Sequence, residues 1–504
     1  MNKVHRSIGF SAIDRYGSTV LLLLATMILA RLLSPAEFGV YGAITALTML
    51  ATVSSREFGG ANYLIQKSNL SEQDIRTAFT VSAGMGTLFA AILFGLRDVF
   101  ASFYSEPGLQ IGIAIAAVNF LLMPFSGTMS ALLRRDMSFD VIAGCNLTAN
   151  VVNAATSVGL AASGHGFISP LLGALAGHAV LTTLFLGYHG RLRMFRPCLR
   201  GWREVVGFGA SSSAVAIINV LYQMSPQLIM GRVLGFGAVG LWGRAVNITQ
   251  IFDKAVGEVL SPVIMPAVFA QARASADLKG VYLRAAELIA AVQWPCLVFI
   301  ALMAQPIVSI LLGPAWGETV PLVRMLCLAS LCMFSACLSY PILVAVGRIN
   351  DVLLASLISV PPSVMIIAAA SFAGLQAVAA ATFLTLPLQA VVMMSFIARR
   401  FGIGLRDWAG ALHKSALATS TCAIGPLTIV AFNGWSLDVP VLGLVGAAVG
   451  ALIGWWLGLI MTRHPLASEA CKAGSDLLAA APAVRLARIA QAVRSKPVPP
   501  LARE

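Results

Sequence analysis

Amide side chains recur at helical spacing inside long apolar runs, and they are the first residues with which the chain could do chemistry. Asn146, Asn150 and Asn153 fall on one stripe of a helix, and Asn219 and Gln223 do the same in a later run. An amide left in hydrocarbon without a partner is costly. Each stripe is therefore predicted either to hydrogen-bond a neighbouring helix or to line a water-filled cavity that binds a polar solute. The residues alone leave both alternatives open.

Charged side chains inside the apolar runs are the second group of candidates. Arg244, Lys254 and Glu258 share one side of a single predicted helix. Lys254 and Glu258 are four residues apart, so a self-contained pair and a cavity role are both open. Arg244 has no acid on its own face within three turns, which favours a cation in a cavity. Arg15 lies early in the first run and is compatible with an arginine that snorkels to the interface or with a ligand.

Catalytic motifs are absent from the sequence. It contains no GxxxxGK[ST] phosphate loop, no HExxH and no GxSxG. The eight cysteines form no CxxC motif and no Cys/His cluster at metal-ligand spacing. We therefore expect neither an enzyme nor a cofactor or metal site, and we leave open a coupling to a proton or sodium gradient.

The composition identifies the elements that must position these residues. Of 504 residues, 58% are hydrophobic and 11% are charged, and the mean hydropathy is +0.85. A soluble domain carries about a quarter charged residues, so the chain is predicted to be an all-α integral membrane protein. At about 20 residues per crossing, fourteen apolar runs between residues 10 and 462 predict about 14 transmembrane helices.

The distribution of charge predicts the orientation in the membrane. The formal net charge is +13, and in a chain this apolar such a balance indicates basic cytoplasmic loops rather than nucleic-acid binding. Every second gap between runs is short and poor in Lys and Arg, whereas the other gaps carry most of the 34 basic residues. Both termini are therefore expected in the cytoplasm, with Arg31 and Arg232 as anchors at the outer interface.

An internal repeat divides the chain. A pattern of Arg, Leu, Gly, aromatic and Gly at residues 31–42 recurs at residues 232–243, an offset of 201 from Arg31 to Arg232. Six predicted spans separate the copies, so the repeats run parallel, related by a pseudo-two-fold axis along the membrane normal. The predicted domains are an N-terminal lobe (1–190), a basic linker (191–205), a C-terminal lobe of six further helices (206–400), two added spans (401–462) and a basic cytoplasmic tail (463–504).

Several strings resemble bacterial polysaccharide exporters. They include Leu-Ala-Arg-Leu-Leu-Ser-Pro-Ala-Glu-Phe-Gly-Val-Tyr at 29–41, Leu-Arg-Arg-Asp-Met-Ser-Phe from Leu133, and Leu-Gly-Pro-Ala-Trp from Leu312. The resemblance is to the oligosaccharide flippases of the multidrug/oligosaccharidyl-lipid/polysaccharide superfamily and covers roughly residues 7–400. One departure is Gln227, where relatives often carry an acid, and it puts in doubt a cation-coupled step that relies on that position.

The resemblance implies a MATE-like fold of two six-helix lobes around a cavity that opens alternately to each side. It implies a cargo of undecaprenyl-pyrophosphate-linked oligosaccharide, moved from the cytoplasmic to the periplasmic leaflet of the bacterial inner membrane for exopolysaccharide, capsule or O-antigen synthesis. Lipid-linked oligosaccharide and membrane lipids are then the partners, and a polymerase and a chain-length regulator stay open as further ones. The alternatives are a drug or cation antiporter of the same superfamily and a membrane-embedded polysaccharide polymerase or ligase.

Overall fold

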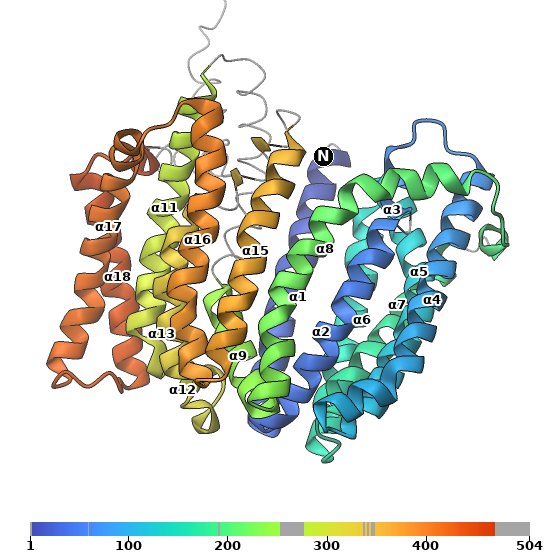
Figure 1. The fold of residues 1–504 in the computed structure, drawn as a ribbon, viewed down its shortest axis with the longest axis horizontal. Coiled ribbons are helices and arrows are strands. Elements are labelled where there is room, and N and C mark those ends of the chain that lie inside the picture. The colour runs from blue at the N-terminus through green and yellow to red at the C-terminus, as the bar shows by residue number, and fades with distance from the viewer. Residues whose placement is uncertain are drawn as a thin grey trace, which may run out of the picture.

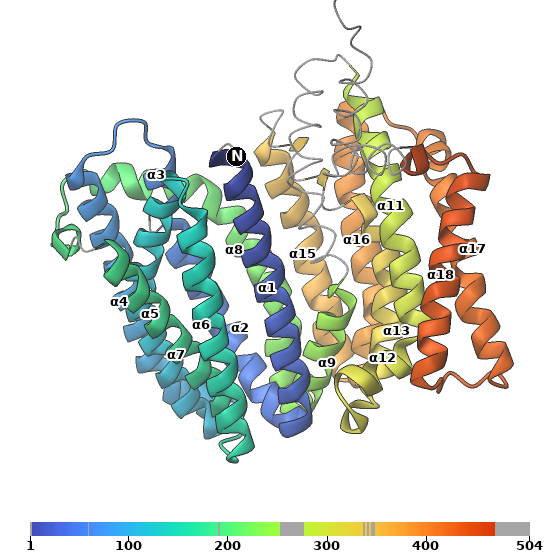
Figure 2. The same ribbon diagram turned by 180° about the vertical axis from the view of Figure 1, so that it is seen from behind.

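The computed structural model describes residues 3–58, 60–189, 192–251, 277–335, 338–339, 342–343 and 348–468, and over these ranges the chain is helical with no strand. The helices lie side by side with their long axes roughly parallel (Figures 1 and 2). Eleven of them are long and apolar enough to cross a membrane. The protein is therefore a multi-pass membrane protein.

Two groups of helices, called here the first half (residues 3–189) and the second half (residues 202–401), make up most of the described structure. The helices of the first half are α1 (Lys3–Leu32), α2 (Pro35–Phe58), α3 (Ala61–Gln66), α4 (Glu72–Tyr104), α5 (Gly108–Arg135), α6 (Phe139–Ala162) and α7 (Ile168–His189). The second half contains α8 (Trp202–Val233), α9 (Phe236–Thr249), α11 (Leu278–Leu302), α12 (Ala304–Leu311), α13 (Thr319–Ser330), α15 (Ile349–Ser371) and α16 (Leu375–Phe401). The pair α17 (Leu405–Phe432) and α18 (Val441–Met461) follows, and short 3₁₀ turns span Leu192–Phe195, Pro314–Trp316 and Leu331–Ser335.

The predicted spans agree with these helices. The eleven membrane-crossing helices include all but α3, α8, α9, α12 and α13. Helices α8, α9 and α13 occupy three further positions at which the sequence predicts spans, although the total of fourteen stays a prediction. Short connections such as 33–34, 105–107 and 372–374 gather at one end of the molecule, the short-loop end, and the N-terminus lies at the other, the N-terminal end (Figure 1).

One long apolar run of the sequence, residues 284–312, is divided between two helices: α11 ends at Leu302 and α12 starts at Ala304. Pro306 explains the break, because it has no N–H to donate to the carbonyl of Leu302 and its ring clashes with that carbonyl in a continuous helix. At the third position of α12 the same proline is tolerated, since N–H groups there have no partner within the helix.

Helix α8 connects the two halves. Its first turn packs on the first half, where Val205 is buried with Ala78 of α4, and Lys67 forms ion pairs with Asp74 at 3.1 Å and with Glu204 of α8 at 3.4 Å. From there α8 crosses the N-terminal end of the first half and then descends toward the short-loop end (Figure 1). The later part of α8 packs against both α2 and α15.

The two halves approach closely where α2 crosses α9. A Cβ added to Gly39 would lie 1.7 Å from the carbonyl oxygen of Phe236, and one added to Gly240 would lie 1.9 Å from the carbonyl oxygen of Pro35. Each glycine thus rests on the backbone that begins the opposite helix. Pro35 and Phe236 are 201 residues apart, as are Gly39 and Gly240, so the contact is reciprocal and relates the halves by a local two-fold. The repeat offset of 201 residues found in the sequence therefore also separates the equivalent residues of this contact.

The buried hydrophobic clusters differ between the two ends of the molecule. One large cluster joins both halves near the short-loop end and includes Leu109 of α5, Met230 of α8 and Leu322 of α13. Toward the N-terminal end, Met129 and Phe185 belong to a cluster of the first half, and a different cluster lies within the second half. In the described part of the chain, the two halves thus share their large core near the short-loop end, whereas at the N-terminal end a small cluster joins the first turn of α8 to the first half.

The α17–α18 pair is attached to α11. Trp455 donates to the carbonyl of Ala291 at 2.7 Å, and Ser415 donates to the carbonyl of Glu287 at 3.0 Å. His464, just beyond α18, accepts from a backbone N–H through Nδ1, which leaves Nε2 to donate to Ser415 Oγ, 3.2 Å away. Burial lowers the pKa of His464 to about 4, so the imidazole that holds this junction is neutral at neutral pH.

The glycine crossing can be tested by adding one methyl group. We expect Gly39→Ala to destabilise the protein by about 1–3 kcal/mol, because the new Cβ must push α2 away from α9. The thermal midpoint of unfolding in detergent measures the effect. Gly84→Ala is the matched control, because a Cβ at this helical glycine meets no atom within 4 Å, and it should leave the midpoint unchanged or raise it. Equal midpoints for the two variants would contradict the crossing.

Candidate functional site

Along one face of α8, the side chains are exposed in the earlier part of the helix and buried in its later part. Asn219, Gln223, Pro226 and Met230 follow at intervals of four, three and four residues, so they share a face. Asn219 and Gln223 are exposed, whereas Pro226 and Met230 are buried, and Met230 belongs to the core that joins the halves. The face is therefore open toward the N-terminal end and closed toward the short-loop end.

Helix α1 repeats this gradient 201 residues earlier in the chain. Ser18 and Leu22 correspond to Asn219 and Gln223, and the structure leaves Ser18 half-buried and Leu22 64% exposed. The next equivalents along the helix, Ala25 and Leu29, are both buried at 7% exposure. The two faces thus share the same gradient, from exposed toward the N-terminal end to buried toward the short-loop end.

The asparagine stripe of α6 lies mainly against α1. Asn146 Nδ2 donates to Asp14 Oδ2 at 2.9 Å, and Asn150 Nδ2 donates to Ser18 Oγ at 2.8 Å. Ser18 Oγ in turn lies 3.4 Å from Asp14 Oδ1. These bonds join the first and fifth spans of the first half. Sequence reasoning missed Asp14 as a site residue, although an acid near the start of the first span was a visible signal.

Asn153, the third member of the stripe, faces α7. Its Oδ1 accepts from Ser157 Oγ at 3.1 Å, and a Cβ on Gly173 of α7 would lie 2.9 Å from the same Oδ1. The structure thus gives interhelical or local partners to all three asparagines of the stripe. Contact of these side chains with a substrate stays a prediction.

The remaining predicted residues are less closely packed or lie elsewhere. The side chain of Arg15 is exposed on α1, next to Asp14, and its carbonyl accepts from Thr19 Oγ1 at 2.8 Å. A ligand role for Arg15 stays a prediction. Lys254 and Glu258 lie outside the described residues, so the structure does not test their predicted pair.

Arg244 is a partly desolvated cation at the interface of the halves. It lies one turn beyond Gly240 on α9, and its guanidinium carbon is 4.4 Å from the centre of the Phe38 ring of α2. Its Nε atom is buried and has no hydrogen-bond partner in the described part of the chain. Burying a polar group without a partner is costly, and an anion is the ligand that would supply one. Arg324 of α13 also has a buried Nε without a hydrogen-bond partner among the described residues.

The short-loop end is held closed by contacts from the second half to the first. Trp316 donates through Nε1 to the carbonyl of Ala30 at 2.8 Å, and Arg31 Nη2 donates to the carbonyl of Ile310 at 3.0 Å. The Trp316 ring also meets Phe38 edge-on, with 5.5 Å between ring centres. Arg31, predicted as an interface anchor, therefore bonds across the two halves.

Similar contacts run from the first half to the second. Tyr104 Oη, at the end of α4, donates to the carbonyl of Leu228 at 3.2 Å, and its ring packs on Phe236 at 5.9 Å. Arg232 lies over the Phe103 ring at 5.5 Å. Each half thus extends an aromatic residue to a carbonyl on the first helix of the other half. We name these two sets of contacts, centred on Trp316 and Tyr104, the short-loop clasp.

Comparison with known families and proteins gives consistent matches. The family described as "Polysaccharide biosynthesis protein" matches residues 28–321. The lipopolysaccharide biosynthesis protein WzxC of Escherichia coli (strain K12) is 26% identical over 314 residues, 61% of this chain and 63% of that protein. The succinoglycan biosynthesis transport protein ExoT of Rhizobium meliloti (strain 1021) is 22% identical over 347 residues, 68% of this chain and 70% of that protein. The match to WzxC thus spans less than two thirds of the relative's length.

Solved structures with the same fold are membrane transporters and flippases. The lipid II flippase MurJ in an inward closed conformation aligns with a TM-score of 0.70 at 12% identity and covers 90% of this chain and 99% of its own. An inward-facing multidrug transporter of the MATE family aligns with a TM-score of 0.64 at 14% identity, covering 79% and 98%. At these identities the likeness establishes the fold, which is the MATE-like architecture that the resemblance implied.

Loss of one hydrogen bond of the clasp should make the short-loop end open more often. Trp316→Phe removes the donor to Ala30 and keeps most of the ring, so opening of the short-loop end should become about fivefold more frequent. A cysteine placed at the fully buried Met230, in a variant without the native cysteines, reports the opening as its rate of labelling by a maleimide.

The matched control is Trp435→Phe. Trp435 lies in the α17–α18 connection at the same end of the molecule and is 74% exposed, so its replacement should not change the labelling rate at position 230. If the two substitutions give the same rate, the Trp316 contact does not hold the halves together.

Proposed function

We propose that this protein translocates an undecaprenyl-pyrophosphate-linked oligosaccharide across the bacterial inner membrane. The chain belongs to the polysaccharide biosynthesis protein family, whose model matches residues 28–321, more than half of the chain. In this proposal the cargo enters from the cytoplasmic leaflet and leaves to the periplasmic leaflet by alternating access. The observations that carry it are the exposed amides Asn219 and Gln223 on α8 and the buried, unbonded Nε of Arg244; in this proposal they line a space between the halves.

The sugar part of the cargo accounts for the exposed amides. Each hydroxyl of an oligosaccharide costs several kcal/mol if it enters hydrocarbon without a hydrogen bond. Asn219 and Gln223 carry both donors and acceptors, so they suit hydroxyl groups of varied orientation. The lipid anchor needs no such partner and can stay in the bilayer while the headgroup passes between the halves.

The pyrophosphate accounts for Arg244. Nine residues into α9, counted from the short-loop end, this arginine lies about 12 Å along the helix, at the closed end of the inter-half space. Its buried, unbonded Nε matches the acceptor oxygens of a phosphate, and charge-assisted bonds of this kind are the stronger ones. The Phe38 ring on the other side holds the guanidinium in place by a cation–π contact.

The crossing and the clasp together supply the alternation. In this proposal, rupture of the clasp and parting of the Gly39–Gly240 crossing beside it open the short-loop end while the halves close at the N-terminal end. Outward movement of a pyrophosphate from a negative interior gains about 2.3 kcal/mol per charge per 100 mV. The membrane potential therefore contributes to the direction of transport without a nucleotide motor.

The proposed orientation places the N-terminal end in the cytoplasm. Exposed arginines gather at this end of the first half, in the last turn of α5, on the segment that leads into α8 and in the first turn of α8; they include Arg134, Arg196, Arg200 and Arg203. Basic residues near the ends of spans are retained on the cytoplasmic side. The space between the halves then faces the leaflet in which lipid-linked sugars are assembled.

Arg244 is the residue whose loss should be most severe. We expect Arg244→Ala to reduce polysaccharide export by about thirtyfold or more, because truncating a buried charge that binds an opposite charge costs about 2–5 kcal/mol. Arg244→Lys keeps the charge and should retain part of the activity. The measurement is polysaccharide output of a strain whose own copy of the gene is deleted, with membrane levels of each variant determined by immunoblot.

Arg324→Ala serves as the control for the loss of a buried arginine. Arg324 shares the unbonded Nε but lies on α13, which packs among α9, α11 and α16 of the second half, so export should persist. Full export by Arg244→Ala, at normal membrane level, would remove Arg244 from the mechanism.

The polar face of α8 gives a second test. Replacing Asn219 and Gln223 together by Ala should lower export about tenfold, since each amide contributes about 0.5–1.5 kcal/mol of hydrogen bonding. Leu221→Ala is the control, because Leu221 is 49% exposed on the opposite side of the same helix and should have no effect. Equal export by both variants would mean that this face does not contact the cargo.

A further inference from the structure

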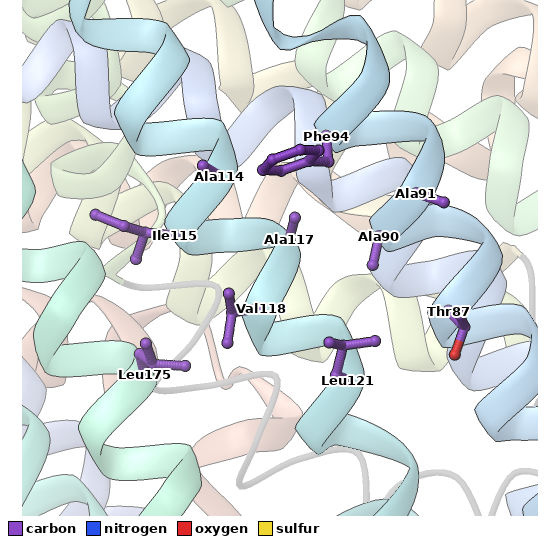
Figure 3. A pocket seen from close by; sticks show the side chains of 10 residues that line it. All are labelled: Thr87, Ala90, Ala91, Phe94, Ala114, Ile115, Ala117, Val118, Leu121 and Leu175. Atoms are coloured by element: carbon purple, nitrogen blue, oxygen red, sulfur yellow. The ribbon is translucent and has the colours of Figure 1, made fainter.

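A shallow apolar groove lies on the outer surface of the first half, away from the space between the halves. It has a volume of about 530 Å³ and is formed by α4 and α5 with one residue of α7. Small side chains create it: four alanines, with Phe94 at one end (Figure 3). These are Ala90, Ala91, Ala114 and Ala117. Except for the Thr87 hydroxyl its lining is apolar, so its chemistry is suited to a hydrocarbon chain.

A pair of opposite charges stands at the Phe94 end of the groove. Arg97 follows Phe94 by three residues on α4, and its guanidinium carbon lies 3.9 Å from the centre of the Phe94 ring. Arg97 Nε is 3.6 Å from Asp98 Oδ1, and the two side chains are 33% and 65% exposed. The ring fixes the cation above the groove, and the carboxylate beside it is open to the surroundings.

The positions of Arg97 and of the groove along α4 suit the headgroup and one chain of a lipid. Arg97 lies seven residues before Tyr104, the end of α4, which is about 10 Å along the helix and corresponds to the headgroup region of the leaflet at the short-loop end. Phe94 and Thr87 mark the extent of the groove on α4, which runs from below the charge pair toward the middle of the bilayer. An apolar slot under a charged rim is the shape of one lipid chain under its headgroup.

We propose that this groove and the Arg97–Asp98 pair bind a zwitterionic phospholipid with a primary amine, a phosphatidylethanolamine, of the leaflet at the short-loop end. One acyl chain occupies the groove, the phosphate binds Arg97 and the ammonium group binds Asp98. An exposed pair of adjacent charges contributes little by itself, so both groups are available to the headgroup. Asp98 disfavours an anionic lipid, which would bring only negative charge to the rim. The binding does not depend on the proposed transport function.

The experiment uses the purified full-length protein in detergent, incubated with an equimolar mixture of phosphatidylethanolamine, phosphatidylglycerol and phosphatidylcholine. Retained lipids are quantified by mass spectrometry after removal of unbound lipid. We expect the wild type to retain phosphatidylethanolamine over both others. Ala91→Phe fills the groove and should lower its retention about fivefold, the loss of a contact of about 1 kcal/mol. Ala155→Phe, at an exposed alanine of α6, is the control and should change nothing.

The rim is tested by Asp98→Asn, which alters an exposed side chain and therefore leaves folding intact. Loss of the carboxylate frees Arg97 from its pair, so the preference should shift from phosphatidylethanolamine to phosphatidylglycerol. Retention in Ala91→Phe equal to that in Ala155→Phe would overturn the groove. An unchanged ratio of the two lipids in Asp98→Asn would overturn the assignment of the headgroup, and thermal midpoints of all variants identify any that fail to fold.

Discussion

Two glycines that meet the opposite backbone determine how the two halves of this protein are joined. At the α2–α9 crossing, Gly39 and Gly240 leave no room for a single methyl group, because each lies against the carbonyl that begins the other helix. The contact has the same form in both directions, as two copies of one repeat require. It lies near the short-loop end, so the shared core and the aromatic contacts of the clasp gather around it.

The polar side chains of the helices are of two kinds. Within the first half, Asn146 and Asn150 are bonded to α1, and in the second half Gln389 of α16 donates to Ser363 of α15. Such pairs stabilise the packing of helices inside a lobe. Between the halves, Asn219, Gln223 and the Nε of Arg244 have no such bonded partner in the described residues, and a transport function draws on groups of this second kind.

The outer surface adds a different kind of site. The alanines between α4 and α5 leave a groove because their side chains are too small to fill the space between the helices, and the Arg97–Asp98 pair stands at its Phe94 end. The α17–α18 pair is attached to α11 through hydrogen bonds of neutral groups, such as that of Trp455 to Ala291, and through the ion pair of Lys279 with Asp407 at 2.6 Å.

Much of the architecture could be predicted from the sequence, because the bilayer requires long apolar helices and the repeat leaves an offset that can be counted. The positions of the apolar helices and the parallel repeat follow from these features, whereas the contact between the two copies at Gly39 and Gly240 is seen only in the structure. The break at Pro306 was also readable in principle, since proline removes a specific hydrogen bond. What only the tertiary structure decided is which polar stripes are bonded and which are open. Asn150 and Gln223 have the same chemistry and similar spacing, and only the presence or absence of a facing helix distinguishes them.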